Sequence, residues 1–402
     1  MSALAQSDRL AIDGGTPVRT APIGEWPLSG PEEERLLLEA LHSGRWGTID
    51  GTLVERFEAE FAALQDARHG VSCVNATMGL AVAMKAVGVG PGDEVIVPPY
   101  TFIATASAAL MLGAIPIFVD VEPETLQIDP EGIAPALTRK TKAIVPVHHG
   151  GSPADMDGVM GAARRHGLRV VEDAAQAHGA AWRGRPVGAI GDVGVFSFQS
   201  SKPMTAGEGG MMTTDDDELD ELLWSYRNVG RRRGGEWYEH VRLGWNLRMT
   251  EFQAAVLLAQ IERFPAQQVQ RTKAAAYLSA RLEEIPGVVP LRVPDGVTAH
   301  SWYTYQFRWL GARAGGLPKQ RFAAALMAEG IPLFHTYTPL NRNEAVRTAI
   351  ARLGGDAPGA CPNAERAEQE EALMFGLPIL MGSDPDLDDV AAAVAKVARA
   401  RA

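Results

Sequence analysis

Cysteine is scarce in this sequence, with only Cys73 and Cys361 among 402 residues. Two cysteines exclude a disulfide framework and argue against a zinc site or iron–sulfur cluster built from several thiolates. Positive charge is also in deficit, because 38 Lys and Arg residues face 49 Asp and Glu residues, for a formal net charge of −11. Binding to nucleic acid requires clustered excess cation, so we expect no nucleic-acid partner.

An uninterrupted membrane-spanning run is lacking as well. The segment from Val95 to Val119 carries no charge and is long enough to cross a bilayer, but Pro98, Pro99 and Pro116 interrupt it. We interpret it as a buried strand, a turn, a helix and a second strand. Residues 1–15 show no basic segment followed by an apolar core. We therefore expect no signal peptide, no membrane partner and a cytoplasmic location.

Short apolar runs alternate with longer amphipathic segments from about residue 70 onward. This alternation predicts βαβ units and a mainly parallel sheet that is buried on both faces. Ligands of such sheets bind beyond the carboxyl ends of the strands. The expected strands are 71–74, 94–97, 115–119, 143–147, 169–171, 193–198 and 210–213, and the expected helices between them are 78–87, 102–112 and 155–165.

The texture of the sequence changes after Thr214. An acidic stretch at 215–218 precedes a helix, and a long Ala-, Leu- and Gln-rich helix from Glu251 to Arg263 is expected to end at Pro265. The remainder indicates a strand near 303–309 and helices near 321–328 and 390–402. We expect a large domain over residues 1–265 and a smaller α+β domain over 266–402.

Lys202 stands at a strand-to-loop junction. A strand ends near Ser197–Phe198, the lysine follows four residues after Phe198, and a glycine-rich turn comes next at 207–210. A lysine in this position of an α/β protein is a candidate Schiff-base residue, which needs the lowered pKa that burial supplies. A solvated surface lysine is the alternative.

Acidic and amide side chains follow another buried strand. The strand that begins at Arg169 ends in Glu172-Asp173, and Gln176 comes three residues later. A carboxylate at the end of a buried strand suits a cationic partner such as a pyridinium nitrogen, which it keeps protonated. The alternative for Asp173 is a cap on the following turn.

Small and hydroxyl residues lie between a strand and a helix at 74–80. The free backbone N–H groups at the start of a helix make this position an anion site. N-capping by Asn75 or Thr77 is the alternative. Phe102 follows the next strand, where it would either stack on a planar ligand or join the core.

Taken together, these segments resemble the PLP-dependent DegT/StrS family of sugar and cyclitol aminotransferases. The resemblance implies an α/β fold of fold-type I, with a mainly parallel seven-stranded sheet flanked by helices and a smaller α+β C-terminal domain. The motifs that carry it are Leu10-Ala-Ile-Asp-Gly-Gly15, Glu55-Arg-Phe-Glu58, Gly92-Asp-Glu-Val-Ile-Val-Pro98, Glu172-Asp-Ala-Ala-Gln176, Lys202 with Gly207-Glu-Gly-Gly210, and Gly244-Trp-Asn-Leu-Arg-Met-Thr-Glu-Phe-Gln-Ala-Ala255.

The resemblance also implies roles for individual residues. Lys202 would hold pyridoxal 5′-phosphate (PLP) as a Schiff base and move the proton during transamination, while Asp173 would pair with the ring nitrogen. The other implied cofactor contacts are Gln176 at the 3′-oxygen, Phe102 stacked on the ring, and Thr77, the Met78 N–H and Ser197 at the phosphate. Asn246 would reach the phosphate from a neighbouring subunit, which implies a homodimer with shared active sites.

Gln199 bears on the substrate, because many family members have histidine at this position. With Val147-His148 and Ala154-Asp-Met-Asp157, it resembles the glutamine-dependent scyllo-inosose aminotransferases of aminoglycoside pathways and the 3-amino-5-hydroxybenzoate synthases. The implied reaction moves an amino group from L-glutamine or L-glutamate to a ketone of a cyclitol or keto-sugar. A 3-amino-5-hydroxybenzoate synthase-like enzyme and a nucleotide-sugar aminotransferase are the alternatives.

His335 and Arg231 are candidate substrate residues, and the resemblance implies that Phe334-His-Thr-Tyr337 lies where the family often has a His-Tyr pair near the substrate. A packed histidine in the small domain and a solvated turn at 231–233 are the corresponding structural alternatives. Three further histidines, at positions 148, 149 and 178, follow different strands and have no cysteine nearby, so we expect no metal site.

Overall fold

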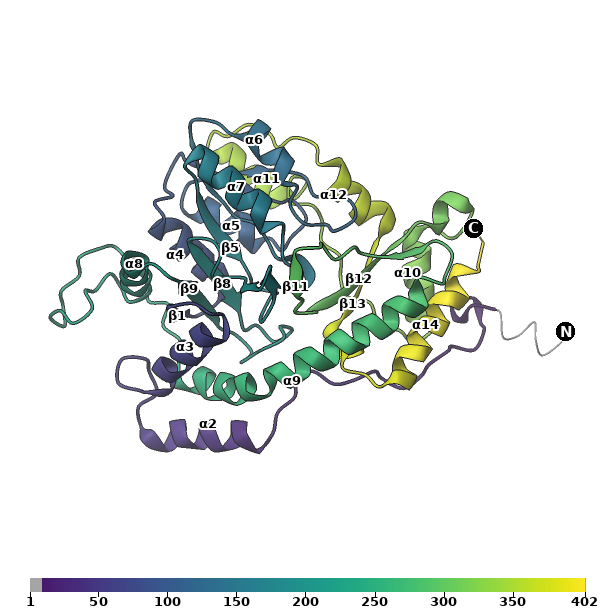
Figure 1. The fold of residues 1–402 in the computed structure, drawn as a ribbon, viewed down its shortest axis with the longest axis horizontal. Coiled ribbons are helices and arrows are strands. Elements are labelled where there is room, and N and C mark those ends of the chain that lie inside the picture. The colour runs from purple at the N-terminus through teal and green to yellow at the C-terminus, as the bar shows by residue number, and fades with distance from the viewer. Residues whose placement is uncertain (1–8, 402) are drawn as a thin grey trace.

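A seven-stranded sheet forms the centre of the computed structural model, which describes residues 9–401 (Figure 1). The strand order is β1-β9-β8-β5-β4-β2-β3, and β9 runs antiparallel to both of its neighbours while the other pairings are parallel. The mainly parallel seven-stranded sheet is therefore confirmed. Its strands are β1 (His69–Cys73), β9 (Gly210–Thr214), β8 (Val193–Ser197), β5 (Arg169–Asp173), β4 (Thr141–Ile144), β2 (Glu94–Val97) and β3 (Ile115–Phe118).

Helices cover both faces of this sheet, which is why its strands are almost continuously apolar. On one face, Val171 and its neighbours pack against α4 (Ala76–Ala86), α5 (Ala104–Met111) and α8 (Asp217–Arg227). On the other face, Val170 packs against α7 (Met156–His166), and Phe196 packs against α3 (Leu53–Leu64) and the first half of α9 (Glu251–Leu282). The expected helices are all present, and β4 lies two to three residues earlier than expected.

Helix α9 contradicts the expectation that the chain leaves its helix at Pro265. The helix continues from Glu251 to Leu282 with the proline inside it. An internal proline costs about 3 kcal/mol, mainly through a lost backbone hydrogen bond. Here both halves of α9 are held by packing, since Leu258 and Phe264 join the core of the sheet while Leu278 and Leu282 join a second core. The proposed domain boundary at 265/266 thus falls within a continuous helix.

The second core belongs to a three-stranded antiparallel sheet near the C-terminus. Its strands, in the order β10 (Val288–Pro290), β12 (Thr304–Trp309) and β13 (Ala372–Gly376), pack against α9, α10 (Lys319–Ala328) and α14 (Asp384–Ala398). A third small sheet joins β6 (Ala181–Trp182), β7 (Arg185–Pro186) and β11 (Val297–Ala299). The remaining helices are α2 (Pro31–Ser43), α6 (Ile133–Ala136), α11 (Glu344–Arg352), α12 (Pro362–Arg366), α13 (Leu377–Leu380), the 3-10 turns Ala11–Asp13, Pro130–Gly132, His149–Gly151 and Gly311–Ala314, and a π-helical turn at Ala367–Glu371.

An N-terminal arm connects the two cores. Arg19 forms ion pairs with Asp386 and Asp389, and farther along the arm the Trp26 indole N–H donates to the Lys202 carbonyl at 3.1 Å. Residues 1–8, which belong to the expected large domain and to the segment judged free of a signal peptide, lie outside the described residues. Between residues 9 and 401, no helix combines the length and apolar character needed to cross a membrane.

Candidate active site

A cavity of about 590 Å³ lies at the carboxyl ends of the parallel strands. The loops that follow β1, β2, β5 and β8 form most of its wall, and residues of the C-terminal part of the chain close it. Seven of the ten predicted site residues line it, namely Thr77, Phe102, Asp173, Gln176, Ser197, Lys202 and His335. These residues are far apart in sequence, and the sheet brings them together as its topology predicts.

Lys202 is held in a tight turn after β8. Its backbone N–H donates to the Gln199 carbonyl at 2.9 Å, and its Nζ lies 4.3 Å from the centroid of the Tyr303 ring. Burial lowers the pKa of the Lys202 amine to about 8, an effect that the charge of Asp173 partly opposes. With this pKa, about a tenth of the amine is unprotonated at pH 7, and the unprotonated form is the one that attacks a carbonyl. The solvated-surface alternative is wrong.

Asp173 ends β5 with its carboxylate buried, at 5% exposure. Thr105 Oγ1 donates to Oδ2 at 2.7 Å, and the Ala175 N–H donates to Oδ1 at 3.2 Å. Within residues 9–401 no cation forms an ion pair with it, and burial raises its pKa above the ordinary value. A carboxylate buried without a cation, in the wall of a cavity, fits the protonated ring nitrogen of PLP. The residues present therefore fit the cofactor.

The start of α4 is capped by a side chain and also lines the cavity. Asn75 Oδ1 accepts the Met78 N–H at 2.9 Å, so the capping alternative is confirmed for Asn75. This N–H is the predicted phosphate donor, but Met78 does not line the cavity, and its role at a phosphate stays a prediction. Thr77 and Ser197 do face the cavity at this end.

Phe102 is 56% exposed and lines the cavity, so it is not a core residue. An exposed aromatic ring in a cavity wall is available for stacking on a planar ring.

Arg231 and Asn246 lie outside this cavity. Arg231 stacks on Trp237 at 4.1 Å in the loop after α8, which protrudes from the body of the molecule in Figure 1. Asn246 is exposed, and its neighbour Leu247 accepts the Val74 N–H at 2.9 Å beside the start of α4. The assignments of Arg231 to a substrate and of Asn246 to a second active site stay predictions.

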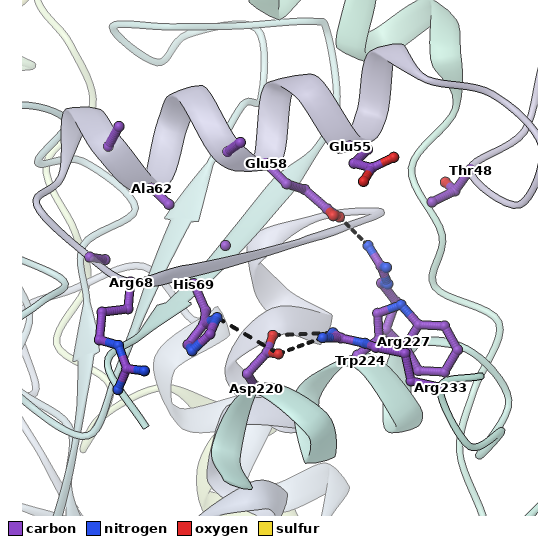
Figure 2. A pocket seen from close by; sticks show the side chains of 14 residues that line it. Thr48, Glu55, Glu58, Ala62, Arg68, His69, Asp220, Trp224, Arg227 and Arg233 are labelled. Carbon is purple, nitrogen blue, oxygen red and sulfur yellow. Dashed lines mark hydrogen bonds and ion pairs between the residues drawn. The ribbon is translucent and has the colours of Figure 1, made fainter. Parts of the chain in front are cut away.

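A second cavity of about 590 Å³ lies between α3, β1 and α8, so volume alone does not identify the active site. Figure 2 shows Glu58 directed at Arg227, and His69 and Arg233 directed at Asp220, whereas Arg68 lies apart from these groups. Glu58 pairs with Arg227, and Asp220 pairs with Arg233 at 2.6 Å. Because Arg233 is neutralised here, the arginines at 231–233 do not form a single anion site.

The sequence profile of the DegT/DnrJ/EryC1/StrS aminotransferase family matches residues 28–395. The chain belongs to this family. It is 40% identical over 414 residues to the L-glutamine:scyllo-inosose aminotransferase of Streptomyces griseus. This alignment covers 96% of this chain and 97% of the relative. The 3-amino-5-hydroxybenzoate synthase of Amycolatopsis mediterranei is 37% identical over 390 residues, covering 93% of this chain and 97% of the relative. A crystal structure of a 3-amino-5-hydroxybenzoic acid synthase superposes with a TM-score of 0.87 at 36% identity, covering 95% of this chain and all of that one.

Family membership confirms the resemblance and the fold that it implied. The structural neighbours of this family member are PLP-dependent aminotransferases, and the central sheet and its flanking helices follow that architecture. The DegT aminotransferases as a family depend on PLP.

Two site residues of this family member were not predicted from the sequence. Thr105 holds Asp173, and Tyr303 covers Lys202. Tyr303 comes from a segment more than a hundred residues beyond Lys202, with no spacing signal that ties the two together, whereas Tyr337 lines the cavity in the same segment as the predicted His335. For Thr105 too, no spacing in the sequence ties the residue to Asp173, which lies 68 positions away.

The histidines are accounted for by packing. The His148 Nδ1 accepts the Ala154 N–H, so its Nε2–H donates to the buried Glu172 at 2.9 Å. His178 packs among aromatic rings that include Phe61 and Phe198. Among the described residues, no group of three or more His, Cys, Asp and Glu side chains is placed to hold a metal ion.

Proposed function

We propose that this chain binds PLP in the cavity around Lys202 and transfers the amino group of L-glutamine to a ketone of a cyclitol. The observation that carries the proposal is that one cavity wall holds both Lys202, whose pKa burial lowers to about 8, and the buried carboxylate of Asp173, which forms no ion pair within residues 9–401. In a PLP enzyme these two groups are the covalent anchor and the ring-nitrogen partner.

Each residue of the cavity wall is assigned to one part of the cofactor. Lys202 would hold the cofactor, Asp173 its ring nitrogen, Phe102 its ring face, and Thr77 with Ser197 its phosphate. When bound, PLP supplies an electron sink for the negative charge that develops at the substrate α-carbon. Lys202 Nζ, once released from the cofactor, is the group in the cavity with a pKa suited to take and return that proton.

The substrates are supported by relatives. The Streptomyces griseus relative is named for L-glutamine and scyllo-inosose, and it spans nearly the whole of this chain. The similarity to 3-amino-5-hydroxybenzoate synthases keeps an aromatising PLP enzyme as the second candidate. A nucleotide-linked keto-sugar is the third acceptor to be tested.

An absorbance spectrum tests the cofactor and the donor together. We expect a yellow protein whose band bleaches on addition of L-glutamine and recovers on addition of scyllo-inosose. Lys202→Ala should not bleach at any donor concentration, whereas Lys140→Ala, an exposed lysine, should behave as the wild type. A protein that stays colourless with added PLP would overturn the cofactor assignment. A band that bleaches but recovers only with another ketone would overturn the cyclitol assignment.

We also propose a homodimer whose active sites are completed across the interface. The loop after α8 exposes Trp237, Tyr238 and Leu243, the last at 91%, which is unusual for side chains left in water. Asn246 of the second subunit would then contact the phosphate. Mixing Asn246→Ala chains with Lys202→Ala chains should restore part of the activity that each lacks alone, and a mixture no more active than its components would refute shared sites.

A further inference from the structure

Two tyrosine hydroxyls, those of Tyr303 and Tyr337, belong to residues that line the active cavity. Each hydroxyl is hydrogen-bonded to a residue that also lines the cavity. The Tyr303 hydroxyl is connected through Ser201 to the Gln199 carboxamide, and the Tyr337 hydroxyl is bonded directly to the Gln176 carboxamide. A hydroxyl has one proton to donate. Its hydrogen bond to the protein therefore decides whether it can donate a hydrogen bond to a ligand or only accept one.

The proton of the Tyr303 hydroxyl is directed at the Ser201 side chain. The Ser201 N–H donates to Gln199 Oε1 at 2.9 Å, which identifies that atom as the carboxamide oxygen. The Ser201 hydroxyl also donates to this oxygen, at 2.7 Å, and has no second proton to donate. The 2.9 Å contact between Ser201 Oγ and the Tyr303 hydroxyl therefore requires Tyr303 to be the donor. What remains at the Tyr303 oxygen is a lone pair.

The Tyr337 hydroxyl has the opposite polarity. The Gly150 N–H donates to Gln176 Oε1 at 2.7 Å, which identifies the oxygen of this carboxamide. Gln176 Nε2 then donates to the Tyr337 hydroxyl at 3.2 Å. The hydroxyl accepts in this contact, and its proton has no acceptor among residues 9–401.

We infer that these two glutamine-directed tyrosines form a recognition pair for hydroxyl groups of the acceptor, with Tyr303 accepting a hydrogen bond and Tyr337 donating one. A polyol offers both functions at each hydroxylated carbon, whereas a carbon without a hydroxyl offers neither. The inference rests on the proposed function and adds to it the residues that select a hydroxylated ring.

Gln199 acts through Ser201 and Tyr303, so it is a positioning residue. Its carboxamide oxygen also takes part in the turn that presents Lys202, whose N–H donates to the Gln199 carbonyl. The Tyr303 ring lies over Lys202 Nζ, so the hydroxyl that Gln199 orients belongs to a residue beside the reacting amine. We expect a change at Gln199 to alter the reaction with the acceptor, because it changes whether the Tyr303 hydroxyl donates its proton to Ser201.

The first experiment measures the two half-reactions and polyol binding separately in Tyr303→Phe and Tyr337→Phe. Phenylalanine keeps each ring and removes only the hydroxyl. We expect kcat/KM for scyllo-inosose to fall about tenfold more than that for L-glutamine, and the Kd of scyllo-inositol, measured by calorimetry on the holoenzyme, to rise about tenfold. Tyr305→Phe is the matched control, because Tyr305 lies on β12, bonds to Ser279 and stays outside this cavity. Equal losses in both half-reactions, or an unchanged Kd, would overturn the inference.

The second experiment tests the direction of the proton. Gln199→Leu frees the Ser201 hydroxyl to donate to Tyr303, so we expect a loss in the scyllo-inosose step similar to that of Tyr303→Phe, with no further loss in the double variant. Gln199→Glu keeps an acceptor for Ser201 and should restore the acceptor step. Ser200→Ala removes the other Gln199 side-chain contact and controls for the turn itself. Additive losses in the double variant would overturn the relay. A wild type that bleaches with L-glutamine but aminates no cyclitol ketone would overturn the proposed acceptor, and the recognition pair with it.

Discussion

Thr105→Val is the change from which the structure makes its most quantitative prediction. Thr105 Oγ1 donates to Asp173 Oδ2 at 2.7 Å, and both side chains are buried. Valine has the same shape and lacks the hydroxyl. A hydrogen bond to a charged group contributes about 1.5–3 kcal/mol, and one pKa unit corresponds to about 1.4 kcal/mol. The pKa of Asp173, which burial already raises, should therefore increase by about one to two further units.

The sign of the effect follows from the role of the carboxylate. Asp173 must be ionised to hold a protonated ring nitrogen, so its protonation at low pH weakens PLP binding. PLP affinity is expected to fall as the pH falls through the pKa of Asp173. In Thr105→Val this fall should occur about one to two pH units higher than in the wild type. Within it, the affinity at a given pH should be about 10- to 100-fold lower. Absorbance titrations with PLP over the pH range in which both proteins stay folded measure both quantities.

Thr105→Ser is the matched control for this variant, because it keeps the hydroxyl and loses only a methyl group. It should follow the wild-type pH profile. If the valine and serine variants bind PLP alike at every pH, the hydrogen bond does not set the ionisation of Asp173, and the reasoning fails.

Three further predictions follow from the same structure. The rate at which the apoprotein captures PLP should rise with pH around a midpoint near 8, because burial lowers the pKa of Lys202 to about 8, and a midpoint near the ordinary value of 10.5 would contradict this. Asp173→Asn should keep PLP bound but slow transamination by orders of magnitude, and stopped-flow rates equal to wild type would remove Asp173 from the ring nitrogen. Glu251→Gln should lower the free energy of unfolding by about 3 kcal/mol in urea, since the Glu251 carboxylate accepts three backbone N–H groups at the start of α3. Glu262→Gln, an exposed change on the same helix, should leave the urea midpoint unchanged.

Alternation of strands and helices was enough to predict where Asp173 and Lys202 lie. Each residue ends or closely follows a strand of a parallel sheet, and parallel strands bring their carboxyl ends to one edge. Local pattern therefore placed two distant residues in one cavity. The same logic located Phe102 and Ser197, which follow or end neighbouring strands.

Contacts between the sheet and the C-terminal region could not be predicted in this way. Tyr303 and Tyr337 reach the cavity because the C-terminal part of the chain packs against it, and no periodicity in the sequence encodes that contact. Pro265 misled the helix assignment for a related reason. Local propensity favours a helix end there, but the burial of Phe264 and Leu278 on both sides of the proline outweighs it.

The continuity of α9 has a consequence for dissecting or recombining this fold. At 1.5 Å per residue its 32 residues form a rod of about 48 Å, and its two ends supply side chains to different cores. Separate fragments cut after Pro265 would each inherit half of the rod, with one apolar stripe unmatched. A chimera that exchanges C-terminal parts between relatives beyond Leu282 keeps the rod complete, but it sets the stripe around Leu278 and Leu282 against the second core of the other relative, so those two surfaces must be matched as well.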